Sequence, residues 1–195
     1  MHRIPCIVAA LLAFSASMNA ATFTFNSDPF AGSDALITPG RQIVGGEPFI
    51  SFDIASDVFA FNPAVFGMGD QVLFVNDLAA NLPTGGVNVI VLQTAPVPFN
   101  AGLAANAIAD QITSPGPGFF IYFNSGLDLP RLVFSTDLSD NTADLRILAR
   151  MVNLSGQSGR DALSTFTESN FVTIPEPSTF LLMTAAGALW GCCAI

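Results

Sequence analysis

Apolar and polar residues alternate along much of the chain with a period of two, the pattern of strands that bury one face. Residues 21–26, Ala-Thr-Phe-Thr-Phe-Asn, show it most clearly. Residues 118–124 carry the run Phe-Phe-Ile-Tyr-Phe, which predicts a strand buried on both faces. The complete series of predicted strands is 21–26, 49–54, 58–61, 71–75, 87–92, 118–124, 131–135, 144–152 and 171–174.

Turn-forming residues separate these runs, for example Pro83-Thr84-Gly85-Gly86 and Pro115-Gly116-Pro117-Gly118. Two segments break the alternation. Residues 101–112 are rich in Ala and place apolar residues at helical spacing, and residues 159–166 are compatible with a second short helix. We therefore expect a mainly β fold, a single β-sandwich or open-barrel-like domain with one or two short helices.

The two ends of the chain have a different character. Residues 1–20 start with His2 and Arg3, continue with an apolar run too short to span a bilayer, and end in small and polar residues, as a secretory signal peptide does. At the other end, Pro175-Glu176-Pro177 cannot enter a helix. The uncharged residues 179–195 that follow would form a helix of about 25 Å, close to the thickness of the hydrocarbon core. The predicted division is 1–20, 21–174 and 175–195.

The C-terminal segment resembles the PEP-CTERM sorting signal of Gram-negative bacteria. The matching residues are Pro175, Glu176, Pro177, Ser178 and Thr179, followed by Leu181 and Leu182. The resemblance implies processing by exosortase, a membrane transpeptidase-like enzyme, and an association with exopolysaccharide and biofilm or floc formation. The family pattern ends in a cluster of basic residues, whereas this chain ends in residues 190–195 without an Arg.

The charge of residues 21–174 narrows the set of partners. This body holds five Arg and no Lys against fourteen carboxylates, and the whole chain has a net charge of −9. A negative charge of this size repels nucleic acid and anionic lipid headgroups. The body also has sixteen Phe, so enough apolar surface is available for a folded core. We expect no nucleic-acid partner.

The residue inventory excludes most catalytic schemes. The only His is His2, and the cysteines are Cys6, Cys192 and Cys193, all outside the body. Nucleophile pairs that need His or Cys, zinc sites built on them and Schiff-base chemistry on Lys are therefore excluded from the body. Hydrolysis by two carboxylates needs neither. Glu47 and Glu168 are the only Glu there, and the catalytic acids could also be Asp. We expect no catalytic residues and no cofactor, with a two-carboxylate hydrolase as the remaining enzymatic alternative.

One segment is rich in oxygen ligands. Asp137, Asp140 and Asp144 lie within eight residues and could coordinate Ca²⁺. The favoured interpretation is that these carboxylates bind backbone groups of their own turns, so no metal site is assigned. Arg146 and Arg150 have an even separation, which predicts that they lie on the same face of their strand. No ligand is assigned to them.

Together these patterns predict an exported, non-enzymatic cell-surface or extracellular-matrix protein. It is expected to be secreted or at the cell surface, with the C-terminal helix in the membrane before processing. The expected partners are an exosortase-like enzyme and exopolysaccharide or other matrix components. The alternative is a secreted carbohydrate- or calcium-binding adhesion module.

Overall fold

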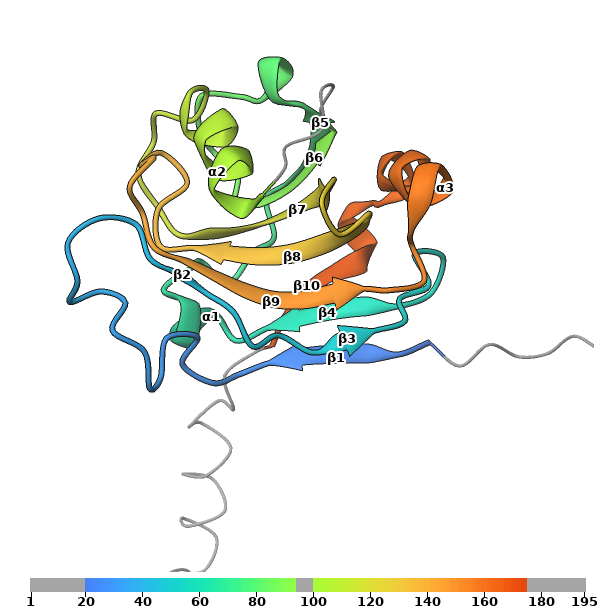
Figure 1. The fold of residues 1–195 in the computed structure, drawn as a ribbon, viewed down its shortest axis with the longest axis horizontal. Helices are drawn as coiled ribbons and strands as arrows, with labels where there is room; N and C mark the ends of the chain where they lie inside the picture. Colours follow the sequence, from blue (N-terminus) through green and yellow to red (C-terminus); the bar gives the residue numbers. More distant parts are fainter. Residues whose placement is uncertain (1–19, 94–99, 175–195) are drawn as a thin grey trace, which may run out of the picture.

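The computed structural model describes residues 20–93 and 100–174, and its fold is mainly β, as the alternating pattern predicts. A seven-stranded sheet has the order β2-β9-β8-β7-β6-β5, with β3 also paired to β9, and a three-stranded sheet has the order β1-β4-β10 (Figure 1). The strands are β1 (Thr22–Phe25), β2 (Ile43–Val44), β3 (Phe49–Ile50), β4 (Val58–Phe61), β5 (Phe74–Leu78), β6 (Val89–Gln93), β7 (Gly118–Asn124), β8 (Leu129–Ser135), β9 (Leu145–Met151) and β10 (Phe171–Thr173). The helices are α1 (Pro63–Phe66), α2 (Ala101–Ala109) and α3 (Gly156–Ala162), with 3-10 turns η1 (Ala79–Asn81), η2 (Leu163–Thr165) and η3 (Glu168–Asn170).

Phenylalanine side chains fill the space between the two sheets. Phe61 of β4 stacks on Phe119 of β7 with ring centroids 3.7 Å apart. Phe59 of the same strand stacks on Phe52 at 4.2 Å. All four rings are buried. The alternating Phe residues of the strands therefore form core, the role that this residue has in most sheets.

Helix α2 covers the other face of the large sheet (Figure 1). Its buried Ala104 and Ile108 join one apolar cluster with Ile90, Phe120 and Val133 of the sheet. Strand β7 is consequently buried at every position, as its run Phe-Phe-Ile-Tyr-Phe predicts. Most neighbouring strands run parallel, and only β7-β8-β9 form an antiparallel meander. Parallel neighbours need crossover connections, and α2 lies in the crossover from β6 to β7.

Local hydrogen bonds explain where predicted and observed elements differ. Strand β5 begins at Phe74 rather than at Gln71, because the Asn88 side chain accepts from the Leu73 N–H and donates to the Gln71 carbonyl. Helix α1 was not predicted. Asn62 caps it by accepting from the Ala64 N–H, and a proline at the first helical position is favourable.

A bulge in β9 overturns the prediction for Arg146 and Arg150. Leu132 of β8 pairs with Ala149, but Val133 pairs with Ile147, so one residue of β9 is inserted between the two pairs. An inserted residue reverses the inward and outward alternation beyond it. Arg150 therefore lies opposite Arg131, whereas Arg146 lies opposite Phe134 on the other face.

Strands β1 and β10 flank β4, so the first and the last described strands share one sheet. Hydrogen bonding continues to Ile174, whose N–H donates to the Phe61 carbonyl over 2.7 Å. The predicted signal peptide, apart from its last residue, and the predicted tail at 175–195 lie outside the described residues. Within the described ranges, no helix has the length and apolarity needed to cross a membrane.

Candidate functional site

Four side chains form a row straight across the large sheet, on the face that α2 also covers. Phe49 of β3 pairs with Arg150 of β9, Arg150 pairs with Arg131 of β8, and Arg131 pairs with Tyr122 of β7. We call this set the arginine row. Neighbouring strands lie about 4.8 Å apart, so the two guanidinium groups are held close together. Like charges directly opposite each other destabilise a sheet, and the row therefore needs a counter-charge.

Glu47 supplies that counter-charge. Its Oε1 accepts from Nη2 of Arg131 over 2.6 Å and from Nε of Arg150. The Glu47 side chain is only 1 % exposed. It comes from the connection between β2 and β3, where Gly46 has a φ of +93°, a conformation that glycine adopts without strain. The carboxylate thus fastens two very short strands to β9.

The electrostatics keep Glu47 ionised. Burial alone raises the pKa of its carboxyl, but hydrogen bonds from its own backbone N–H, from Arg150 and from Arg131 outweigh burial and lower the pKa below its ordinary value. For Arg131, burial lowers the pKa of the guanidinium, but Tyr122 and Glu47 raise this pKa by more, so it lies above its ordinary value. Because both guanidinium groups and the Glu47 carboxylate are charged, the arginine row and Glu47 together have a charge of about +1. An ionised carboxylate held by two arginines has no proton to give, so it does not suit a general acid.

The inner end of the row is enclosed by polar side chains of the fold. The Tyr122 hydroxyl accepts from Nδ2 of Asn124 over 3.0 Å and lies 3.5 Å from Nη1 of Arg131. Tyr122 itself is fully buried. Asn124 in turn accepts from the N–H groups of Gly126 and Leu127 in the β7–β8 turn. These contacts position Arg131, whose side chain is only 10 % exposed.

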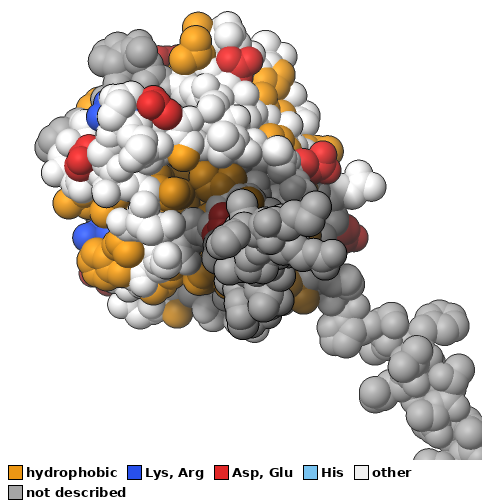
Figure 2. Space-filling view, turned by 90° about the vertical axis from the view of Figure 1, so that its right-hand side faces the viewer, with side chains coloured by type: hydrophobic (Ala, Val, Ile, Leu, Met, Phe, Trp, Pro, Cys, Tyr) orange, Lys and Arg blue, Asp and Glu red, His pale blue; other side chains and the backbone are white. Residues whose placement is uncertain are grey.

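The outer end of the row reaches the surface. The Arg150 side chain is 26 % exposed and its guanidinium lies over the Phe49 ring, 5.0 Å from the centroid. Phe49 is 64 % exposed. No described residue accepts a hydrogen bond from either terminal nitrogen of Arg150. Figure 2 shows few arginines and several scattered carboxylates on the face that it draws. Residues 21–174 hold five Arg against fourteen carboxylates, so a site with a positive local charge stands out in this domain.

The three aspartates considered for Ca²⁺ bind the backbone instead. Asp137 accepts from the N–H groups of Gly116 and Ser139, and Asp140 accepts from that of Thr142. Asp144 fastens the long loop before β2, since its two oxygens accept from the N–H groups of Leu36 and Gln42 over 2.7 and 2.6 Å. No group of three potential metal ligands occurs among the described residues. Asp140 and, through Ser139, Asp137 thus bind backbone groups of their own turns, as the favoured interpretation predicts, whereas Asp144 binds a loop that is distant in the sequence.

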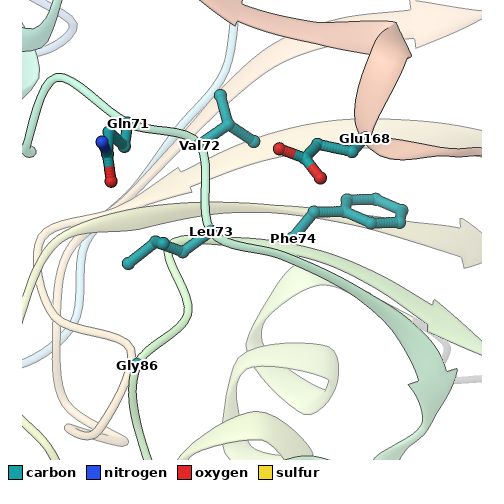
Figure 3. Close-up of a pocket in the computed structure, with 6 residues that line it drawn as sticks. All are labelled: Gln71, Val72, Leu73, Phe74, Gly86 and Glu168. Atoms are coloured by element: carbon teal, nitrogen blue, oxygen red, sulfur yellow. The ribbon is translucent and has the colours of Figure 1, made fainter.

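The two glutamates considered for hydrolysis are not brought together. Glu47 lies beside β9, and Glu168 starts η3 next to β5, at the other side of the large sheet. Glu168 lines an open groove of about 610 Å³ with Gln71, Val72, Leu73, Phe74 and Gly86. Figure 3 shows its carboxylate directed toward Val72, with no second acid among the labelled residues. This groove lacks the carboxylate pair that the mechanism needs.

The arginine row could not be predicted from the sequence, because its members are far apart along the chain. In addition, the bulge in β9 determines that Arg150, and not Arg146, lies opposite Arg131. The signal that was present is Arg131 inside an otherwise apolar strand, since a buried arginine needs a partner.

The sorting residues Pro175, Glu176, Pro177, Ser178 and Thr179 lie outside the described residues. No protein-family model, curated protein or solved structure matches this chain significantly.

Proposed function

We propose that the chain is an exported, non-enzymatic protein of the cell surface or extracellular matrix. Its N-terminal residues act as a signal peptide, and residues 175–195 act as a PEP-CTERM-like tail that an exosortase-like enzyme processes. The observation that carries the proposal is the pairing of these two terminal patterns in one chain. In this proposal the domain between them contacts exopolysaccharide or other matrix components.

Two features of the described domain support this proposal. Its buried carboxylates serve the fold: Glu47 holds two arginines, Asp144 holds a loop, and Asp57 accepts from the backbone N–H groups of Ala21 and Asp53. Ile174, which follows β10 and still donates its N–H to β4, is followed at once by Pro175. A proline and the residue before it favour an extended chain, and an extended segment is what a processing enzyme can bind.

The processing step predicts a change in chain length that depends on the two prolines. In a Gram-negative host that contains an exosortase, the Pro175→Ala, Pro177→Ala double variant should accumulate as a longer, membrane-bound form. The unaltered chain should instead be shortened and leave the membrane fraction. Immunoblots of membrane, surface and medium fractions measure both properties.

The matched control is Pro115→Ala, Pro117→Ala, which changes two prolines of the same spacing inside the domain. It should be processed like the unaltered chain. Equal length and equal distribution of the tail variant and the unaltered chain would contradict processing at this motif.

A further inference from the structure

We propose that Arg150 and Phe49, at the outer end of the arginine row, bind the carboxylate and ring of an acidic sugar. This inference names the chemical class of the matrix partner and rests on the proposed function only for its biological setting. The binding itself is a property of the folded chain wherever the protein resides.

The first support for this proposal is the set of hydrogen-bond donors that Arg150 presents. Its Nε donates to Glu47, which fixes the guanidinium, and its terminal nitrogens have no acceptor among the described residues. Because the side chain is partly exposed, these donors are accessible from solvent. A guanidinium binds a carboxylate through parallel hydrogen bonds, and a group already held in place loses less conformational entropy on binding.

The second support is the positive local charge around Arg150. Arg131 lies directly behind Arg150 on the neighbouring strand, and Glu47 cancels one of the two positive charges. The site therefore keeps a charge of about +1 in a chain whose net charge is −9. An isolated carboxylate is attracted at short range, whereas a dense polyanion is repelled by the rest of the surface. The ligand best suited to this surface has few, well-separated acidic groups.

The third support is Phe49, which favours a ligand that has a sugar ring. It stands on the strand next to Arg150 and exposes most of its surface. An aromatic ring beside a guanidinium can contact the apolar C–H groups of a sugar while the carboxylate of that sugar binds the guanidinium. An aspartate or glutamate side chain offers the carboxylate without the ring. A neutral sugar offers the ring without the carboxylate.

The test is titration calorimetry of the purified full-length chain, in detergent solution, with an oligosaccharide that carries a single galacturonate residue. Neutral malto-oligosaccharide and a sulfated dextran oligosaccharide are the comparison ligands. We expect saturable binding of the galacturonate and at least about tenfold weaker binding of the other two. No galacturonate binding, or equal binding of all three ligands, would overturn the proposal.

Variants assign the binding to these residues. Arg150→Lys keeps the charge beside Glu47 but removes the planar pair of donors, and it should weaken galacturonate binding about tenfold. Phe49→Ser changes an exposed position and should weaken binding about fivefold. Arg160→Lys is the matched control, because Arg160 also lies over an aromatic ring, that of Phe123 at 4.7 Å, and near Asp128.

The control variant should bind as the unaltered chain does. Unchanged affinity in both Arg150→Lys and Phe49→Ser would overturn the proposal, even if the unaltered chain binds galacturonate. Since all titrations use purified protein, failure here leaves export and processing unaffected, and failed processing in cells leaves this result unaffected.

Discussion

The Glu47→Gln variant is expected to lower the free energy of unfolding at neutral pH by about 3 kcal/mol. Removing one partner of a buried ionic cluster costs about 3–5 kcal/mol, because the remaining charge is left uncompensated. Here Arg131 is buried, but Arg150 is partly exposed and water can compensate part of its charge. The expected loss therefore lies at the lower end of this range. Urea unfolding followed by circular dichroism measures the difference.

The effect should also depend on pH. Because the pKa of Glu47 is lowered in the folded state, its charge stabilises the fold fully above the ordinary pKa of 4.5. This contribution is lost as the pH falls through the folded-state pKa. The difference between the unaltered chain and Glu47→Gln should therefore be constant from pH 7 to about 5 and shrink at lower pH.

Glu168→Gln is the matched control, because Glu168 is the other glutamate of the described domain and is exposed. It should change the free energy of unfolding by no more than about 0.5 kcal/mol. Equal stability of Glu47→Gln and Glu168→Gln at neutral pH would contradict the role assigned to Glu47.

The Phe119→Ala variant is expected to lose about 3–5 kcal/mol, the usual cost of removing a fully buried aromatic ring. Phe119 has no exposed surface, stacks on Phe61 of the opposite sheet, and contacts the rings of Phe66 and Phe134 with centroids 4.9 and 5.3 Å away. Its removal opens a cavity between the two sheets. Small domains are stable by about 5–15 kcal/mol in total, so thermal unfolding should begin far below that of the unaltered chain.

Phe119→Leu should show an intermediate loss, since it keeps part of the apolar volume, and it stays measurable if the alanine variant does not fold. The control Phe49→Ala removes a largely exposed ring, so it should cost at most about 1 kcal/mol. A loss for Phe119→Ala no larger than that for Phe49→Ala would contradict the position of the core.

Local pattern was sufficient to predict some strands. The bounds of β7 match its prediction, since an apolar run between a Pro-Gly turn and Ser125-Gly126 leaves little choice. The same holds for β4. Strand β2, with two residues, was missed because a single pair of apolar residues has no period. Its position depends on Glu47 and β9, which lie outside any local window.

The candidate site could be predicted only in part. The capping roles of Asp137 and Asp140 follow from their spacing to nearby N–H groups. The pairing of Arg131 with Arg150 does not, because an even separation predicted Arg146 and Arg150 on one face and the bulge placed them on opposite faces. Whether a strand carries an inserted residue is decided by its partners across the sheet.

The most direct test of the proposed export and sorting is the intact mass of the protein recovered from the native envelope and medium. We predict a mature chain that lacks about twenty N-terminal residues, as expected for a cleaved signal peptide, together with everything beyond the region of Pro175, Glu176 and Pro177. A mass that corresponds to residues 1–195 with both ends intact would contradict export and sorting.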